Sequence, residues 1–309
     1  MYNSEIKQKF ISQYSNKDSM IDACVRLFEM SGPYEAEANS DLCTMDADTL
    51  QPIVSNMLGL RASGHYTTMC ALRAYCNWCL ENGIEGACDG LLNVKDDNTD
   101  KVRRQMVNSP LHLQRYLDAL FDREDEKTND NIYRCFFWLA FGGCSEKDIG
   151  SVMDTDVDFE NMVVRLDGER EYPIYRESLK AFKNCVSLDG FIYKHPNYAK
   201  DVYRFRVEGH ELLRGIRSKP DLMSIRSQIS HKGRNAVRAG KTDQSLSYFR
   251  VWLSGIFYRI YQLELVGIKP DFKELSERFP QENRSRTQKK RTIREYTADY
   301  ERWKVAFIK

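Results

Sequence analysis

The chain has 309 residues, of which 42% are hydrophobic and 29% charged, and its formal net charge is +1. This length is enough for two domains, and the composition is that of an ordinary globular protein. No apolar run approaches the roughly 18 residues that a membrane span requires, and the polar N-terminus lacks the apolar core of a signal peptide. We therefore expect a cytoplasmic protein with no membrane partner.

The small net charge hides an uneven distribution along the chain. Residues 1–150 carry 15 basic against 23 acidic side chains, whereas residues 151–309 carry 31 against 22, so the two parts have net charges of −8 and +9. A polyanion is therefore expected to bind mainly to the second part. The alternative is a chance split in which both kinds of charge lie on solvated faces.

Nine cysteines, an odd number, suit a reducing compartment. Several of them have apolar neighbours, as small core residues do. Cys76 and Cys79 form a CxxC pair, but they lie within a helical pattern and no second pair is nearby. Burial on a helix is favoured over zinc binding or redox chemistry, and we expect no metal or other cofactor.

Apolar residues at helical spacing predict that residues 1–92 form a helical domain. Helices are expected at 7–14 and 20–30, where Gly32-Pro33 is predicted to end the second helix. Asp46 or Asp48 is a candidate N-cap for the next helix, and a further helix should run from Gly64 to about residue 82. This part of the chain shows no strand-like alternation.

Residues 93–108 are polar and are interpreted as a linker to a second domain at 109–309. Ser109-Pro110 predicts a helix start, and a second apolar helix should stop at Gly142-Gly143. Residues 162–166 and 171–175 flank the turn Asp167-Gly168 as a β-hairpin would. The remainder is expected to be helical, with a basic loop at 226–245 and a basic C-terminal helix. The predicted fold class is therefore mainly α with a small β-sheet.

The order of these segments resembles the phage integrase, or tyrosine recombinase, family over nearly the whole chain. Residues 41–84 resemble its helical core-binding domain. The second part is similar in five ordered features: an apolar helix ending at Gly143, then Asp148-Ile149, Asp156-Val157-Asp158, the strand 162–166 and Tyr172-Pro173-Ile174. The resemblance implies a two-domain integrase-like architecture with an α+β catalytic-like domain that binds double-stranded DNA.

Most of the catalytic residues that the resemblance implies are missing. The first arginine should fall near Cys144 or Ser145, but no arginine occurs from 135 to 164. Ser145 instead has the pattern of a helix cap, with Asp148 three positions later. The hairpin lysine is also not evident; Arg165 and Arg170 flank the turn, but arginine is a poor general acid.

The family's His-x-x-Arg motif corresponds to Ser247-Tyr248-Phe249-Arg250, so the histidine is replaced by Ser247. Arg250 is predicted on or beside a core face, where its guanidinium needs an anion, and we favour a DNA phosphate. The literal motif His231-x-x-Arg234 is interpreted as part of the basic loop. The doubtful nucleophiles Tyr296 and Tyr300 come late, on a terminal helix where packing against this subunit or a partner is favoured over nucleophilic attack.

The hypothesis is a non-catalytic, sequence-specific DNA-binding protein that acts as a transcriptional repressor in the lysogeny of a prophage or mobile element and resembles the SPβ-type prophage master repressors. Two domains would clamp the duplex, and a homo-oligomer could form through the C-terminal helix. The alternatives are an atypical recombinase using Tyr296 or Tyr300, and a helical scaffold that binds protein. The expected DNA-binding residues are Arg61, His65, Tyr66, Thr67, Thr68, Arg73, Arg103, Arg104, Lys232, Arg234, Arg238, Lys241 and Arg250.

Overall fold

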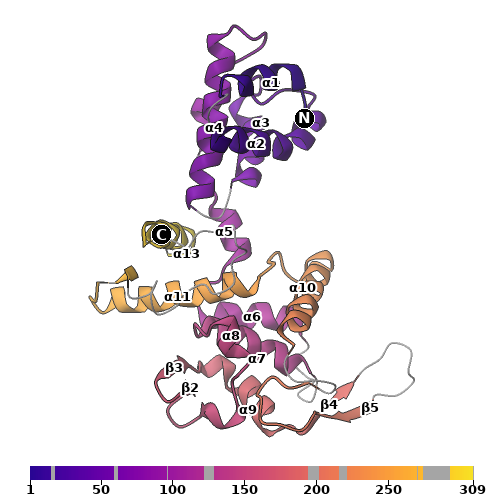
Figure 1. Ribbon diagram of the computed structural model, residues 1–309, viewed down its shortest axis with the longest axis vertical. Helices are drawn as coiled ribbons and strands as arrows, with labels where there is room; N and C mark the ends of the chain where they lie inside the picture. Colours follow the sequence, from indigo (N-terminus) through magenta and orange to yellow (C-terminus); the bar gives the residue numbers. More distant parts are fainter. Residues whose placement is uncertain are drawn as a thin grey trace. The chain divides into compact units, whose positions relative to one another are not determined.

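The computed structural model describes residues 1–14, 18–58, 62–95, 97–121, 129–193, 202–215, 221–269, 271–273 and 293–308. Within these ranges the chain is mainly helical with two small antiparallel sheets, so the predicted fold class is confirmed (Figure 1). The chain divides into two compact units: unit 1 is Met1–Val102 with Arg294–Lys309, and unit 2 is Arg103–Ile293. The C-terminal segment thus groups with unit 1, whereas the boundaries expected from the sequence assign it to the second domain.

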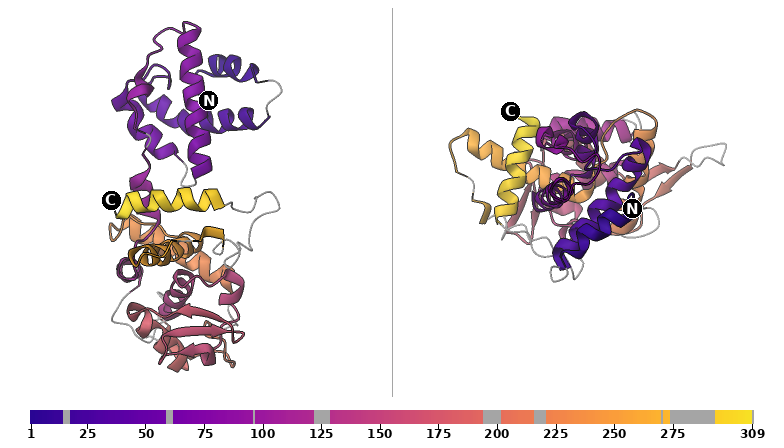
Figure 2. Two further views of the ribbon diagram at one scale, coloured as in Figure 1. Left: turned by 90° about the vertical axis from the view of Figure 1, so that its left-hand side faces the viewer. Right: turned by 90° about the horizontal axis from the view of Figure 1, so that it is seen from above.

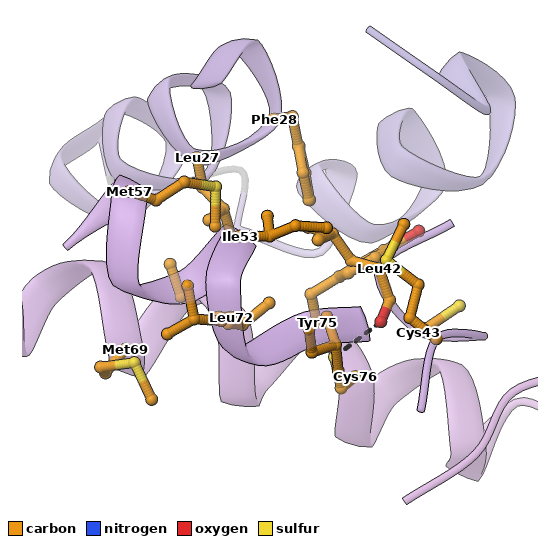
Figure 3. Packing of buried hydrophobic residues seen from close by; sticks show 14 of the residues in the cluster. Leu27, Phe28, Leu42, Cys43, Ile53, Met57, Met69, Leu72, Tyr75 and Cys76 are labelled. Carbon is orange, nitrogen blue, oxygen red and sulfur yellow. Dashed lines mark hydrogen bonds between the residues drawn. The ribbon is translucent and has the colours of Figure 1, made fainter. Parts of the chain in front are cut away.

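Unit 1 is helical, and its N-terminal helices surround one apolar core. Its elements are α1 (Ser4–Ser12), α2 (Asp18–Ala38), α3 (Ala47–Met57), α4 (Ala62–Glu81), the 3-10 turn η1 (Gly90–Asn93) and α13 (Ile293–Phe307). Side chains from α2, α3 and α4 and from the segment between α2 and α3 interlock in the core, as Figure 3 shows for Phe28, Ile53, Leu72 and Tyr75. Of the two predicted caps for α3 the structure selects Asp46, whose carboxylate accepts a hydrogen bond from the Thr49 amide at 2.9 Å.

The prediction that Gly32-Pro33 ends the second helix is wrong, because α2 continues through Pro33 to Ala38. Proline deprives the helix of one backbone donor. Ser31 and Glu35 lie one turn apart on either side of Pro33, both fully buried, and the Ser31 hydroxyl donates to the Glu35 carboxylate at 2.8 Å. Tertiary burial of this face therefore outweighs the local preference to stop.

A buried ion pair lies in the core of unit 1. Lys7 Nζ is 2.6 Å from both carboxylate oxygens of Glu35, and neither side chain is exposed to solvent. The Lys7 ammonium also lies 5.0 Å from the ring centroid of Phe28, and the Leu42 amide donates to Glu35 at 3.0 Å. The charges are thus paired and hydrogen-bonded, as burial requires.

Unit 2 surrounds α7, a helix whose side chains are almost all buried. Its elements are α6 (Pro110–Leu120), α7 (Asp130–Phe141), α8 (Glu146–Ile149), η2 (Asp154–Asp156), β1 (Val157–Asp158), β2 (Val163–Leu166), β3 (Arg170–Pro173), η3 (Arg176–Ser178), α9 (Leu179–Ser187), β4 (Gly190–Tyr193), β5 (Val202–Phe205), α10 (Leu222–Arg238) and α11 (Tyr248–Leu265), with α5 (Thr99–Gln105) at the junction. Helix α7 contacts α11 and α9, and Figure 2 shows α11 and the strands on opposite sides of α7.

Close packing joins α11 to the C-terminal end of α7. A Cβ atom at Gly255 would lie 1.8 Å from the backbone oxygen of Phe141, so only glycine permits this approach. Three α11 side chains then donate to backbone carbonyls at the last residue of α7 and in the segment just after it. Tyr248 Oη donates to Cys144 O at 2.8 Å, Trp252 Nε1 to Gly143 O at 3.1 Å and Arg259 Nη1 to Phe141 O at 2.8 Å.

The predicted hairpin is confirmed, since β2 and β3 pair in antiparallel register with Val164 opposite Tyr172. Asp167 and Gly168 both have positive φ, which matches the twist of a tight hairpin turn. Strand β1 extends this sheet to three strands. A second hairpin, β4–β5, was not expected from the sequence, because its strands are only four residues each and carry aromatic residues without clear alternation.

Candidate nucleic-acid interface

Cys144 and Ser145, where the resemblance leads us to expect the first arginine, lie at the start of a short helix. Cys144 is fully buried, and burial raises the pKa of its thiol well above the ordinary value. Ser145 caps α8: its hydroxyl accepts from the Asp148 amide at 3.2 Å and donates to the Asp148 carboxylate at 2.8 Å. The predicted cap is therefore confirmed. A neutral cap beside a carboxylate cannot stabilise the negative charge that develops in phosphoryl transfer.

Asp148 connects α8 to the hairpin. Besides Ser145, its carboxylate accepts from Arg170 Nη1 at 2.6 Å and from Tyr172 Oη at 3.3 Å. Arg170 also donates to Asp167, and the hydrogen bonds to Asp148 and Asp167 raise its pKa above the ordinary value. Arg170 is thus held by two carboxylates and cannot act as a general acid near neutral pH.

Arg165, the other arginine of the hairpin, is also engaged by carboxylates. It donates to Glu171 at 2.8 Å and to Asp158. Hydrogen bonds from Asn161, together with Arg165, lower the pKa of Asp158 to about 2. Both arginines of the hairpin are therefore paired with carboxylates.

Ser247 is the N-cap of α11, and its hydroxyl accepts from the Arg250 amide at 3.4 Å. Arg250 lies in the first turn of α11, half-buried, with its guanidinium carbon 5.7 Å from the Phe249 ring centroid. Its position beside buried residues is the one predicted. Its binding to a DNA phosphate stays a prediction.

The two doubtful nucleophiles are buried side chains of α13. Tyr296 is 5% exposed and Tyr300 is 1% exposed. The Tyr300 ring stacks on Trp303 with centroids 6.0 Å apart, and Lys304 Nζ lies 4.9 Å from the Tyr300 ring. A hydroxyl that attacks a phosphate has to reach it, so this burial favours a packing role. Helix α13 carries three basic and three acidic residues, so it is not the basic helix expected; most of the preceding basic run lies outside the described residues.

The expected basic loop at 226–245 is instead largely a helix. Helix α10 runs from Leu222 to Arg238, and the Asp221 carboxylate caps it by accepting from the amides of Met223 and Ser224. Its buried stripe is Ile225, Ile229, Gly233 and Ala236. The last two residues of this stripe, Gly233 and Ala236, are small, so the sequence alone did not show a clear amphipathic pattern. Gly233 lets α10 approach α6, since a Cβ there would lie 3.3 Å from the Tyr116 hydroxyl.

The outward face of α10 is basic and contains no acidic residue between Leu222 and Arg238. Ser227, His231, Arg234 and Arg238 are exposed and lie at helical spacing of four, three and four residues. Lys241 follows on the next turn, where its amide donates to Ala236 O at 2.9 Å. Such a face suits contact with phosphates.

Arg103 and Arg104 are anchored to the loop that follows α10. Gln244 Nε2 donates to Arg103 O at 2.8 Å, and the Ser245 amide donates to Arg104 O at 3.1 Å. Gln244 is also 2.9 Å from His112 Nε2. These backbone contacts join the end of α5 to the loop that follows α10. We use the name α10 basic surface for the exposed basic residues of these two segments: Arg103, Arg104, Arg234, Arg238 and Lys241.

Lys232 does not belong to this surface. Its ammonium lies 3.0 Å from the Asp130 carboxylate and 5.1 Å from the Phe121 ring centroid. Half-buried against α7, it contributes to packing within unit 2. Arg226, at the other end of α10, similarly pairs with Glu146.

In unit 1 the predicted DNA-binding residues fall on different faces of α4. Tyr66, Thr67 and Arg73 are exposed, whereas Thr68 is half-buried and donates to Gly64 O at 2.9 Å. His65 is only 3% exposed, so its side chain is not presented on the surface, because it lies on the core side of the helix. Arg61 lies outside the described residues.

Sequence reasoning missed one residue on the exposed face of α4 and one residue of α13 whose charge acts on that face. Asn77 is exposed and lies four residues after Arg73. Arg294 of α13 is exposed, and its charge, with that of Arg73, acts on the Tyr66 hydroxyl, whose pKa a hydrogen bond with Cys70 raises. Helical periodicity could have found Asn77; no local signal points to Arg294.

Residues 1–81 match the model of a protein family described as MrpR, N-terminal core-binding domain. The match supports an integrase-type core-binding domain at the N-terminal end of the chain, in agreement with the helical architecture of unit 1, and such a domain suggests DNA binding. No curated protein matches the chain significantly.

Two further findings bear on the kind of site. Among the residues that the structure describes, no three His, Cys, Asp or Glu side chains converge on a position that could hold a metal ion. Cys76 and Cys79 of the CxxC pair are both buried. Nor, in those parts of the chain, does any helix have the length and apolar character to cross a membrane.

Proposed function

We propose that the chain is a non-catalytic, sequence-specific DNA-binding protein that acts in the cytoplasm as a transcriptional repressor of a prophage or mobile element. Both units contribute contacts to the duplex. The integrase-type match of residues 1–81 supports DNA binding. The single observation that carries the proposal is the α10 basic surface of unit 2.

This surface has the properties that a phosphate-binding face needs. Arg234 and Arg238 project from a helix without acidic residues, and the two anchored arginines of α5 extend the same charge. Each phosphate neutralised releases condensed counterions, so log K should fall linearly with log salt concentration with a slope of about −0.9 per phosphate.

The non-catalytic part of the proposal is supported by the Asp148 carboxylate. It accepts a hydrogen bond from Ser145, near the position where the family resemblance expects a phosphate-stabilising arginine, and it pairs with the guanidinium of Arg170. A carboxylate repels a DNA phosphate at this position. The burial of Tyr296 and Tyr300 adds to this argument.

A binding titration tests the proposal. Binding of the whole chain to a 40-base-pair duplex is measured over a range of salt concentrations, for the wild type and for Arg238→Ala. The wild type should bind with a steep salt dependence, and the variant should lose about one unit of slope. Arg165→Ala is the matched control: it removes a basic residue of unit 2 that two carboxylates already neutralise, so its slope should equal that of the wild type.

A second measurement separates binding from catalysis. Nicked suicide substrates that trap a phosphotyrosine intermediate should give no covalent adduct with the wild type. An adduct that disappears in Tyr300→Phe or Tyr296→Phe would establish an atypical recombinase instead. A failure to bind heparin or DNA at moderate salt would favour the protein-binding scaffold.

Separate assays test the regulatory role and the assembly state. Genome-wide recovery of bound fragments should return sites upstream of phage genes if the protein is a prophage repressor. Sedimentation of the whole chain tests self-association through α13; a monomer at every concentration would remove that part of the proposal.

A further inference from the structure

The exposed face of α4 carries a narrow stripe of polar and aromatic side chains. Tyr66, Cys70, Arg73 and Asn77 are spaced by four, three and four residues, so they lie along one side of the helix. Tyr66 is 69% exposed, and Arg73 and Asn77 are exposed as well. The opposite side, with Leu72, Tyr75 and Cys79, is fully buried in the core of unit 1.

The chemistry of this stripe differs from that of the α10 basic surface. On α10 the exposed groups are several positive charges with hydroxyls and a histidine, a set that suits phosphates. The α4 stripe offers one guanidinium, one carboxamide and one aromatic ring. Arginine pairs with the O6 and N7 atoms of guanine, asparagine pairs with N6 and N7 of adenine, and apolar groups contact the thymine methyl in the major groove.

The geometry also fits base readout. An α-helix fits the major groove of B-DNA, and the helix presents no acidic residue before Glu81, its last residue. Arg73 and Asn77 are four residues apart, about 6 Å along the helix axis. Base pairs rise by about 3.4 Å, so these two side chains would reach bases separated by roughly two steps.

We propose, on the basis of the DNA binding proposed above, that α4 recognises the DNA bases and that α10 binds the phosphate backbone of the DNA. Arg73 recognises a guanine, Asn77 recognises an adenine about two base pairs away, and the ring of Tyr66 contacts a neighbouring base. The positive charge of Arg294, close to Tyr66, helps to hold this side of unit 1 against the duplex.

The test is selection of bound fragments from a random DNA library, followed by titration of the selected site and its single-base variants. Arg73→Lys keeps the positive charge but removes the planar guanidinium that can donate two hydrogen bonds to one guanine. The ratio of affinities for guanine over other bases at one position should therefore fall by roughly ten- to a hundred-fold, while the salt dependence of binding is unchanged. Asn77→Ala should lose the preference for adenine at a second position. Arg238→Ala on α10 is the control: it should weaken all sequences alike.

The outcomes are distinguishable. If Arg73→Lys and Asn77→Ala, folded by circular dichroism, keep the wild-type sequence preference, the readout inference is overturned and DNA binding stands. If the wild type binds every sequence equally, base readout is likewise excluded. If the wild type binds no DNA, the proposed function itself fails and the inference with it.

Discussion

The carboxylate of Asp148 accepts a hydrogen bond from Nη1 of Arg170 at 2.6 Å, which connects α8 to the β2–β3 hairpin across 22 residues of sequence. Tyr172, two residues after Arg170, reaches the same carboxylate. A carboxylate therefore lies close to the position where the family resemblance expects an arginine. We expect this carboxylate to stabilise the fold of unit 2.

The first prediction concerns this contact. Asp148→Ala removes the shared acceptor of Arg170, Tyr172 and Ser145 and should lower the free energy of unfolding by about 1–2 kcal/mol. Urea denaturation measures the change. Glu171→Ala, which breaks an exposed pair with Arg165 in the same hairpin, is the control and should leave the midpoint nearly unchanged. Equal losses in both variants would show that Asp148 has no special role.

The second prediction concerns the buried pair in unit 1. Lys7→Met leaves the Glu35 carboxylate buried without its cation and should cost about 3–5 kcal/mol. The double variant Lys7→Met/Glu35→Gln removes both charges while keeping an acceptor for the Leu42 amide, and it should recover part of that loss. Thermal unfolding of both variants checks this order. Lys9→Met, which disrupts an exposed pair with Glu5, should have no resolvable effect.

The third prediction concerns the approach of α11 to α7. Gly255→Ala places a Cβ against the backbone oxygen of Phe141, which cannot move aside as a flexible side chain would, so unit 2 should lose about 3 kcal/mol. Gly64→Ala, in an open position on α4, should be neutral or slightly stabilising. Chemical denaturation compares the two; a tolerated Gly255→Ala would contradict the close packing.

The fourth prediction concerns pH. Burial lowers the pKa of His112 below its ordinary value of 6.5. The unfolded state therefore binds more protons than the folded state in the range just below pH 6.5, so stability is complete above that pH and is lost as the pH falls toward the folded pKa. His112→Asn should flatten this part of the profile. Unfolding midpoints measured from pH 7.5 to 5 check it; an unchanged slope in the variant would refute it.

Local signals in the sequence predicted several elements correctly. Ser109 and Ser145 cap their helices as expected, and Asp167-Gly168 makes the hairpin turn, because caps and tight turns depend on residues only a few positions apart. Local signals failed where burial depended on distant partners. The buried stripe of α10 ends in Gly233, which lies close to Tyr116 of α6, and in Ala236; both residues are too small to give a clear apolar period.

The features of the candidate site also fall into two groups: those that the sequence predicts and those that only the folded structure shows. The amino-acid sequence by itself determined the fold class, the uneven charge and the lack of an arginine between 135 and 164, since these depend on composition and residue order alone. Only the tertiary structure decided that the backbone of Arg103 and Arg104 is hydrogen-bonded to the loop after α10, that His65 is buried and that Lys232 and Arg170 are paired with carboxylates. The physical reason is that the environment of a charge depends on groups brought close by folding, and separation along the chain does not report that distance.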